Sequence, residues 1–283
     1  MSDTTRESAH QWRASLNLTY REAQGRTVCH AEHLGPLRVL QALYPEGSAV
    51  CHHVLVHPPS GLAGGDLIEI QAEILPGAHA FITTPGASRF YRTQGPLARQ
   101  RLRVKLHDRA RLEWLPLETI AYSGCKAHNE WVFDLAPGAE MMAWDVVALG
   151  LPESDLPFVS GYYQQHFEVS GAWLDRGRID AHDQRLLQSA VGLAGHRCLA
   201  SLIMAAGTPL PASRVESALE LARQVQGSDR CWLGVTHPQS KVLVARVLAD
   251  HAEPARRVLQ EIWSRWRPLL WGLHPQPSRM WQV

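Results

Sequence analysis

Cysteine is scarce in this 283-residue sequence, and its spacing matches neither a disulfide framework nor a structural metal site. The five cysteines are scattered, odd in number and without a C-x-x-C pair. Neither a disulfide framework nor a structural zinc site is therefore indicated. We expect all five to be reduced and mostly buried: Cys29, Cys51, Cys125, Cys198 and Cys231.

Long apolar runs and an excess of one charge are also missing. No run approaches the roughly 20 apolar residues that cross a bilayer. The first residues, MSDTTRESAHQW, are polar and partly acidic, unlike a signal or transit peptide. With 28 Lys and Arg against 27 Asp and Glu, the formal net charge is +1. We therefore expect a cytoplasmic protein whose main partner is neither nucleic acid nor a membrane.

The common catalytic and nucleotide-binding motifs are absent as well. The segment GLAGGD at 61–66 lacks both the Lys-Ser/Thr of a P-loop and the spacing of a dinucleotide turn. There is no G-x-S-x-G elbow, and Cys125 has no evident histidine partner. The sequence therefore favours a protein that is not an enzyme. The alternative is a hydrolase that uses Glu113, Glu118 or Asp145 in a cleft.

A repeated strand–turn–strand unit dominates the region from 67 to 145. The copies are LIEIQAEI-LPGAHAFITT, RQRLRVKL-HDRARLEWLP and NEWVFDLA-PGAEMMAWDV, and the aligned alanines are Ala78, Ala110 and Ala139. Apolar and polar positions alternate in each strand. Such a unit buries its apolar face only against a neighbour, which predicts hairpins stacked in a β-helix-like body. An antiparallel sandwich would show similar alternation.

Stacking predicts that the second strands of all units end at one polar edge of the body. A carboxylate at the end of a half-buried strand is costly unless it is paired, solvated or bound to a cation. The carboxylates could pair with one another and with Arg89, or line a conduit that passes a hydrated divalent ion along. We expect Asp66 either to cap the Gly64–Gly65 turn or to face a cavity. The residues expected at this edge are Thr83, Thr84, Glu113, Leu115, Pro116, Glu118, Asp145 and the loop 87–93.

A histidine-rich strand precedes the repeats. The period of two over 50–57 places Cys51, His53 and His57 on one face. Thiol and imidazole groups suit a transition metal, although a partner would have to complete the coordination sphere. The alternative is a strand that happens to be rich in histidine.

The C-terminal part changes to a helical period. We expect a helix beginning at the Ser213-x-x-Glu216 capping box, a hairpin, and a second helix over 253–270. The predicted fold is therefore mainly β, with a β-helix-like body over 12–210. An αββα subdomain with about two helices covers 211–283, unless the two parts form one domain. Three of the ten tryptophans, Trp263, Trp266 and Trp271, either seal this part to the body or face a partner.

Several motifs together resemble the urease accessory protein D family (UreD, or UreH in some organisms). The likeness runs from about Trp12 to the C-terminus and is most specific over 35–150. The matching segments are GPLRV at 35–39, YPEG at 44–47, CH at 51–52, HPPSGLAGGD at 57–66, GAHAFITTPGASRFYRTQG at 77–95, LEWLPLETI at 112–120, LG at 149–150, GLAGH at 192–196 and the terminal SRMWQV.

This resemblance implies a non-catalytic chaperone of nickel insertion with a β-helix-like fold. It implies binding to apo-urease and recruitment of an accessory F protein, which holds a GTPase (G), in a higher-order complex. It also implies no permanently bound cofactor, because nickel passes transiently through an internal tunnel. The family residues proposed for that path match Asp66, Ser88, Asp145 and Asp175 here.

The sequence also departs from the family pattern. HPPGG reads HPPSG, LPQE reads LPLE, and LGRPxxGE reads LGLPESDL. The last change places Leu151 and Leu156 where the family has an arginine and a glutamate. Both charges of this family loop are thus replaced by apolar side chains.

Overall fold

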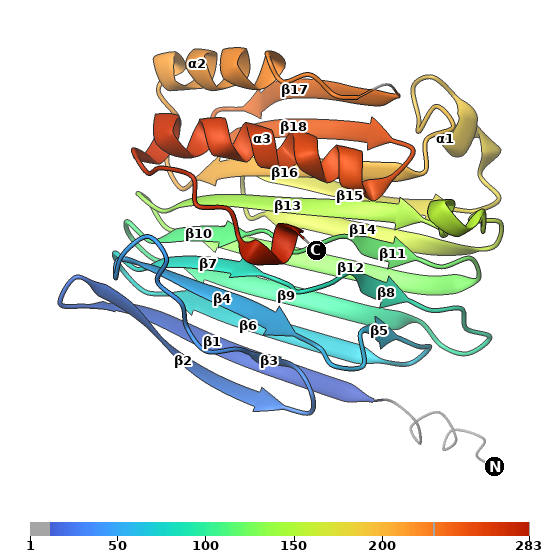
Figure 1. Cartoon of the computed structure of the whole chain (residues 1–283), viewed down its shortest axis with the longest axis horizontal. Coiled ribbons are helices and arrows are strands. Elements are labelled where there is room, and N and C mark those ends of the chain that lie inside the picture. Colours follow the sequence, from blue (N-terminus) through green and yellow to red (C-terminus); the bar gives the residue numbers. More distant parts are fainter. Residues whose placement is uncertain (1–11, 229, 283) are drawn as a thin grey trace.

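The alternating strands fold into two facing sheets, with helices packed on the outer face of one of them (Figure 1). A computed structural model describes residues 12–228 and 230–282. The first sheet has the order β15-β14-β12-β9-β6-β1-β2. Its strands are β1 Arg13–Ala23, β2 Arg26–Leu34, β6 Leu67–Ile74, β9 Ala98–Leu106, β12 Cys125–Leu135, β14 Gly161–Val169 and β15 Trp173–Asp180.

The second sheet has the order β17-β18-β16-β13-β10-β7-β4-β3, and β11, β8 and β5 continue its interrupted strands. Its early strands are β3 Arg38–Val39, β4 Val50–Val56, β5 Gly61–Leu62, β7 His79–Thr83, β8 Ser88–Phe90 and β10 Arg111–Trp114. Its later strands are β11 Thr119–Ala121, β13 Glu140–Leu149, β16 Cys198–Ala206, β17 Cys231–Gln239 and β18 Val242–Ala249. The helices are α1 Gln184–Gln188, α2 Ala212–Arg223 and α3 Ala252–Trp271, with 3₁₀ turns η1 Pro152–Ser154 and η2 Arg279–Gln282.

The repeated unit is an arch rather than the hairpin that the sequence suggested. The strands β6, β9 and β12 pair in parallel in the first sheet, and β7, β10 and β13 pair in parallel in the second. Each unit therefore crosses from one sheet to the other at its turn, and stacking gives a β-solenoid of about 4 turns. Parallel pairing confirms the β-helix-like body and excludes the antiparallel sandwich.

The turn chemistry explains the crossing. The residue before each buried alanine has a positive φ: 73° at Gly77, 55° at Arg109 and 82° at Gly138. Glycine adopts this conformation without steric penalty, which matches two of the three copies. The alanines at 78, 110 and 139 are all fully buried, so a small side chain fits where the chain enters the second sheet.

Two apolar cores result from the alternation. Inward residues such as Leu102, Phe133 and Ile203 pack between the sheets. Outward residues of the second sheet, such as Phe81, Trp144 and Leu202, pack under the helices. A single strand such as β13 therefore contributes to both cores. Its alternate residues face the space between the sheets, and the residues between them face the helices.

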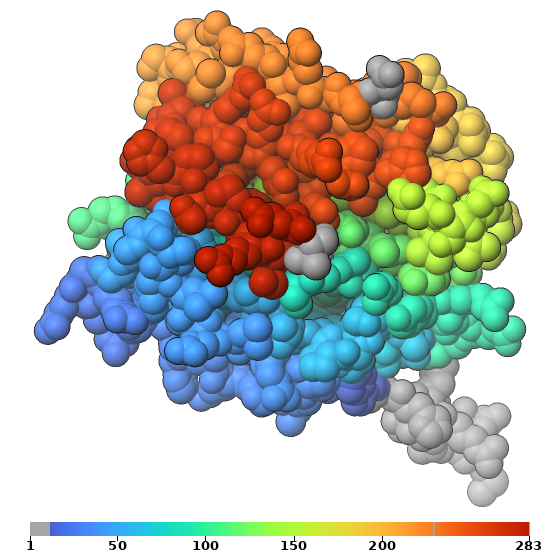
Figure 2. All heavy atoms as spheres, in the orientation of Figure 1, coloured from blue at the N-terminus to red at the C-terminus, as the bar shows by residue number. Residues whose placement is uncertain are grey.

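The C-terminal part shows the predicted order of helix, hairpin and helix, and its hairpin extends the second sheet. β18 pairs antiparallel with β16, and β17 pairs with β18. The helices α2 and α3 cover this sheet, and Figure 2 shows the C-terminal residues lying against the N-terminal third of the chain. Trp263, Trp266 and Trp271 are buried, so they seal this part to the body rather than face a partner.

The predicted start of α2 was wrong. The helix begins at Ala212 after Pro211, and no side chain caps its N-terminus. Ser213 therefore lies inside the first turn, where Pro211 has already set the direction of the chain. Within the described ranges, no helix is long and apolar enough to cross a membrane.

Candidate functional site

Three proline-containing segments interrupt neighbouring strands of the second sheet at one level. Residues 57–60 follow β4, 84–87 follow β7 and 115–118 follow β10. The chain then resumes as the short strands β5, β8 and β11, whereas β13 continues without a break. Proline has no N–H for a sheet ladder, which explains why the strands stop there. The motif residues thus gather in the middle of the sheet, and the prediction of an edge was wrong.

A small cavity of about 90 Å³ lies beside these breaks. Its polar lining comes from His57, Ser60, Thr84, Ser88 and Gln100, and the rest is largely aliphatic. Ser88 begins β8, and its N–H donates to the Glu118 carbonyl at 2.9 Å. The cavity therefore joins two of the interrupted strands to the inner face of the first sheet, which supplies Gln100 from β9.

Asp66 does not line this cavity but lies near His57, which does, and it stabilises the 63–66 turn. Its carboxylate accepts a hydrogen bond from the Ala63 N–H at 2.7 Å, and its own N–H donates to the Ala63 carbonyl at 3.1 Å. Burial lowers the pKa of His57, and the Asp66 charge partly opposes that shift. The buried His57 Nε2 has no hydrogen-bond partner in the described part of the chain. Asp66 therefore caps the turn, as one of the two sequence interpretations predicted.

Ser60 explains one departure from the family pattern. Its φ is 56°, in the left-handed region that favours glycine. Its hydroxyl oxygen accepts a hydrogen bond from Arg89 Nη1 at 3.0 Å. Ser60 thus has a backbone conformation that favours glycine, but it forms a hydrogen bond to Arg89 of β8 that glycine could not form.

A row of polar side chains crosses the inner face of the first sheet. Gln100 Nε2 donates to Asn129 Oδ1 at 3.2 Å, and Asn129 Nδ2 donates to the Tyr163 hydroxyl at 2.9 Å. Asn129 stands opposite Gln165 in the β12–β14 register. All four residues are buried. Polar groups in an apolar layer need partners, and this row leads from the small cavity towards the far side of the body.

Asp145 faces this row from the second sheet. It lies on β13 and is only 4% exposed. Burial, and secondarily the charge of Asp175, raise its pKa to about 7. Its charge also raises the pKa of Tyr163, which places the two groups near each other. No side-chain hydrogen bond to its carboxylate is present within the described ranges. The Val146 backbone N–H donates to this carboxylate, so Asp145 is a buried carboxyl group without a side-chain partner.

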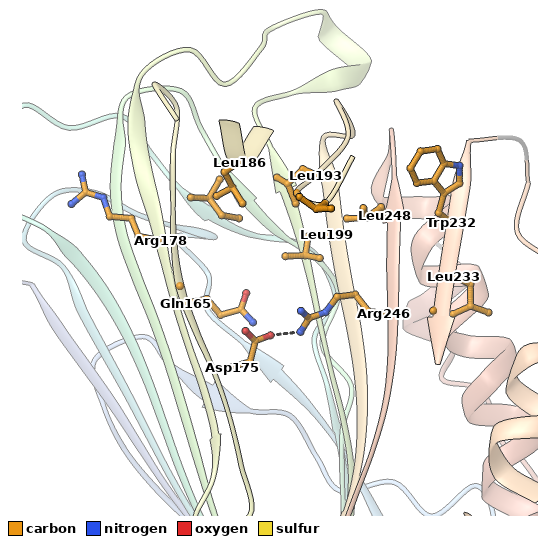
Figure 3. Close-up of a pocket in the computed structure, with 15 residues that line it drawn as sticks. Gln165, Asp175, Arg178, Leu186, Leu193, Leu199, Trp232, Leu233, Arg246 and Leu248 are labelled. Carbon is orange, nitrogen blue, oxygen red and sulfur yellow. Dashed lines mark hydrogen bonds and ion pairs between the residues drawn. The ribbon is translucent and has the colours of Figure 1, made fainter. Parts of the chain in front are cut away.

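A larger cavity of about 530 Å³ lies at the opposite side of the body, between β15 and β18 (Figure 3). Asp175 projects into it from β15 and pairs with Arg246 from β18. Gln165 and apolar side chains such as Leu199 and Leu248 complete much of the wall. The row of polar side chains thus has a cavity at each end.

The four predicted path residues are spread out rather than clustered. Ser88 lines the small cavity and Asp66 lies near it, Asp145 lies in the interior, and Asp175 lies at the large cavity. No group of three or more His, Cys, Asp or Glu side chains converges as a metal site in residues 12–228 and 230–282. Separated oxygen ligands hold a hydrated ion weakly and in succession, whereas a closed site would retain it.

The predicted histidine face divides into two environments. His53 Nδ1 is 2.7 Å from the Tyr20 hydroxyl and 4.0 Å from Cys51 Sγ. Burial lowers the pKa of His53 to about 4, so the ring is neutral. His57 lies beyond the end of β4 at the small cavity. Metal binding by His53 and His57 stays a prediction.

The three carboxylates of the hydrolase alternative do not share a cleft. Glu113 points to the helices and accepts hydrogen bonds from Trp263 Nε1 at 2.6 Å and from Arg267 Nε at 3.1 Å. Glu118 pairs with Arg256 of α3 at 2.6 Å. Asp145 points the other way, between the sheets. Two of the three carboxylates are therefore paired with arginines of α3. The expected pairing of the carboxylates with one another and with Arg89 was wrong, and Arg89 donates to Ser60 instead.

Sequence reasoning missed several residues of this site. Gln100, Asn129, Tyr163, Ser201 and Arg246 face the interior from strands that were predicted only as alternating or were not placed. These residues could have been found in the sequence as polar residues at inward positions of otherwise apolar strands. For Asn129 that signal required knowledge of which face of β12 is inward.

The fold and this site define the class of protein: a two-sheet β-solenoid with a row of polar side chains through its interior. The family model described as "UreD urease accessory protein" matches residues 12–282. The chain therefore belongs to the UreD family of urease accessory proteins. This confirms the resemblance derived from the motifs.

Curated relatives named "Urease accessory protein UreD" are similar over nearly the whole chain. The protein of Variovorax paradoxus (strain S110) is 53% identical over 273 residues, covering 95% of this chain and 99% of its own. That of Paracidovorax citrulli (strain AAC00-1) is 53% identical over 274 residues, covering 96% and 99%. That of Methylibium petroleiphilum is 45% identical over 294 residues, again covering 96% and 99%. The family name supports a role in urease maturation.

Proposed function

We propose that this chain is a non-catalytic chaperone and scaffold that conducts nickel to apo-urease. In this proposal it binds apo-urease in the cytoplasm and recruits the accessory F protein and the GTPase G. Nickel is the cargo and is held only transiently. The observation that carries the proposal is Asp145, a buried carboxyl group without a hydrogen-bonding side-chain partner between two cavities.

The chemistry of the row fits passage rather than storage. Amide, hydroxyl and carboxylate oxygens from Gln100, Asn129, Tyr163 and Asp145 are separated along the interior. Oxygen donors bind nickel less tightly than imidazole or thiolate donors do, so an ion moves on instead of remaining bound. The apolar walls keep competing ligands away from the ion.

Reconstituted urease activation tests the proposal. The chain is mixed with apo-urease, the two accessory proteins, GTP and nickel, and urease activity is measured. We expect Asp145→Asn to reduce activation by about tenfold, equivalent to about 1.4 kcal/mol, while the complex still forms in size-exclusion chromatography. The matched control is Asp134→Asn, because Asp134 is exposed on β12. Normal activation by Asp145→Asn, or activation that does not need this chain, would refute the role.

The same assay separates the two tasks of Asp66. Asparagine at 66 keeps an oxygen that can accept the Ala63 N–H, whereas alanine removes it. A role in conduction predicts that both variants activate poorly. If Asp66→Asn activates normally and only Asp66→Ala fails, then Asp66 acts as a turn cap alone.

A further inference from the structure

Arg246 is a cation placed inside the open side of the solenoid. It lies on β18, in register with Ser201 of β16, which in turn is in register with Asp145 of β13. Directly opposed residues of paired strands point to the same face of a sheet. Arg246 Nε donates to Ser201 Oγ at 3.1 Å. Ile203 and Val244, two positions along on the same two strands, belong to the core between the sheets, so this face lies between the sheets. Asp145, Ser201 and Arg246 therefore form a line towards the large cavity.

The guanidinium of Arg246 also reaches across to the other sheet. Its Nη2 donates to the Asp175 carboxylate on β15, and Figure 3 shows this pair spanning the space between the two sheets. The Arg246 side chain is 41% exposed and Asp175 is 26% exposed. Asp145 behind them is 4% exposed. The ion pair is thus accessible from outside, whereas the carboxyl group behind it is not.

Acidic groups outnumber basic ones at this place. Asp145 and Asp175 are two carboxyl groups, and Arg246 is the one cation that forms an ion pair with either of them in the described part of the chain. Arginine does not lose its proton in a protein, so this positive charge is permanent. A permanent cation on Asp175 repels any other cation that approaches Asp145.

We propose that Arg246 is a displaceable internal counter-ion that closes the large-cavity end of the polar row against free cations. A divalent cation reaches Asp145 from this side only when the Arg246 side chain leaves Asp175, since both ions need the same carboxylate. The identity of the cargo rests on the proposed function above. The exclusion of cations by Arg246 is a property of the isolated chain.

Removal of the guanidinium tests this directly. We expect Arg246→Met, which keeps an unbranched apolar stem, to bind one additional Ni²⁺ with at least about tenfold higher affinity than the native chain. A pair of carboxylates without its own cation holds a divalent ion better than a neutralised pair does. The measurement is isothermal titration with nickel chloride in a non-coordinating buffer. The same titration of the native chain measures the nickel bound by other histidines and cysteines.

Two further variants locate the added site. The double variant Arg246→Met with Asp145→Asn is expected to lose the gain. The control is Arg257→Met, because Arg257 forms an exposed pair with Glu253 on α3 at 2.6 Å, away from the large cavity. It should bind nickel as the native chain does. A gain in Arg257→Met, or a gain that survives loss of Asp145, overturns the proposal.

Arg246→Lys provides a test that does not depend on the methionine variant folding. Lysine keeps the positive charge although it loses the forked contact to Ser201 and Asp175, so its nickel affinity should stay at the native value. A tenfold gain in nickel affinity in folded Arg246→Lys would show that the charge does not exclude cations and overturns the proposal. The two proposals can fail separately. If Arg246→Met gains nickel binding but Asp145→Asn still activates urease normally, the proposed function is refuted and the role of Arg246 stands.

Discussion

Asp145 owes its unusual chemistry to its position on β13. Neighbouring residues of that strand, such as Trp144 and Val146, turn to the helices, whereas Asp145 turns to the space between the sheets. Burial there disfavours the charged form, and Asp175 adds repulsion, so the pKa rises to about 7. The same side chain on an outward position of the first sheet would be an ordinary solvated carboxylate.

This raised pKa predicts a pH-dependent stability. The folded chain binds the Asp145 proton more tightly than the unfolded chain, whose pKa is near 3.8. Its contribution is therefore most favourable below about pH 4 and is lost as pH rises towards 7. Between pH 5 and pH 8, we expect Asp145→Asn to gain about 2 to 3 kcal/mol of unfolding free energy relative to the native chain. Urea unfolding at both pH values measures it, and parallel curves would contradict the raised pKa.

Glu113 is the opposite case, a buried carboxylate whose partners are fixed. His79, Trp263 and Arg267 all contact it, and Arg267 also pairs with Glu46 at 2.7 Å. Hydrogen bonds and the nearby positive charges lower its pKa even though burial alone would raise it. This network ties α3 to the second sheet.

Removing the Glu113 charge should therefore destabilise the fold. We expect Glu113→Gln to lose about 3 kcal/mol of unfolding free energy, because the buried Arg267 keeps its charge with one partner fewer. The control is Glu253→Gln, which breaks an exposed pair with Arg257 and should change stability by less than about 0.5 kcal/mol. Similar losses in urea unfolding for both variants would contradict this assignment.

Among the elements, the C-terminal segment depends most on tertiary contacts. Trp281 in η2 is 7% exposed and lies against Phe81, Trp144 and Trp263. Its Nε1 donates to Thr83 Oγ1 at 2.9 Å. This segment thus fastens the chain end onto β7, next to one of the strand breaks.

Truncation of this tryptophan should loosen the attachment. We expect Trp281→Ala to cost about 3 kcal/mol in thermal or urea unfolding, since it empties a buried aromatic cluster. Trp232→Ala is the control, because Trp232 is 55% exposed and its loss should cost less than about 1 kcal/mol. Equal losses would show that Trp281 contributes no more than a surface side chain.

The elements also show where local sequence signals hold and where they fail. The alternation in the three repeat copies predicted the repeated strands, because a period of two is a local property of a strand between two layers. The helix start at Ser213 was predicted wrongly, because a capping-box pattern competes with a proline two residues earlier. The strand breaks needed the pairing of β4 with β7 and of β7 with β10 before their common level was visible.

At the scale of the whole molecule, the second sheet continues from the solenoid into the C-terminal part. β16 pairs with β13 on one side and with β18 on the other. α3 packs its apolar side on the same core that β13 and β16 supply. The predicted boundary at 210 therefore falls inside one sheet and one core.

This continuity predicts a single cooperative unit. We expect the full chain to unfold in one transition when followed by near-ultraviolet circular dichroism and by tryptophan fluorescence. A fragment of residues 12–210 should aggregate or lack cooperative unfolding, because it exposes the edge of β16 and an uncovered apolar face. A monomeric fragment with its own sharp transition would instead show that the solenoid is an independent domain.

The sequence by itself predicted the family and the β-helix-like body, and both are confirmed. The family resemblance named Asp66, Ser88, Asp145 and Asp175, and their role on a nickel path stays a prediction. Motifs, periodicity and turn residues are local features, so they can be recognised from the sequence alone. Only the tertiary structure decided that Glu113 faces the helices while Asp145 faces the interior, and that Arg246 meets Asp175. These outcomes depend on which face of each strand is inward and on partners up to 154 residues apart, and no local pattern specifies either.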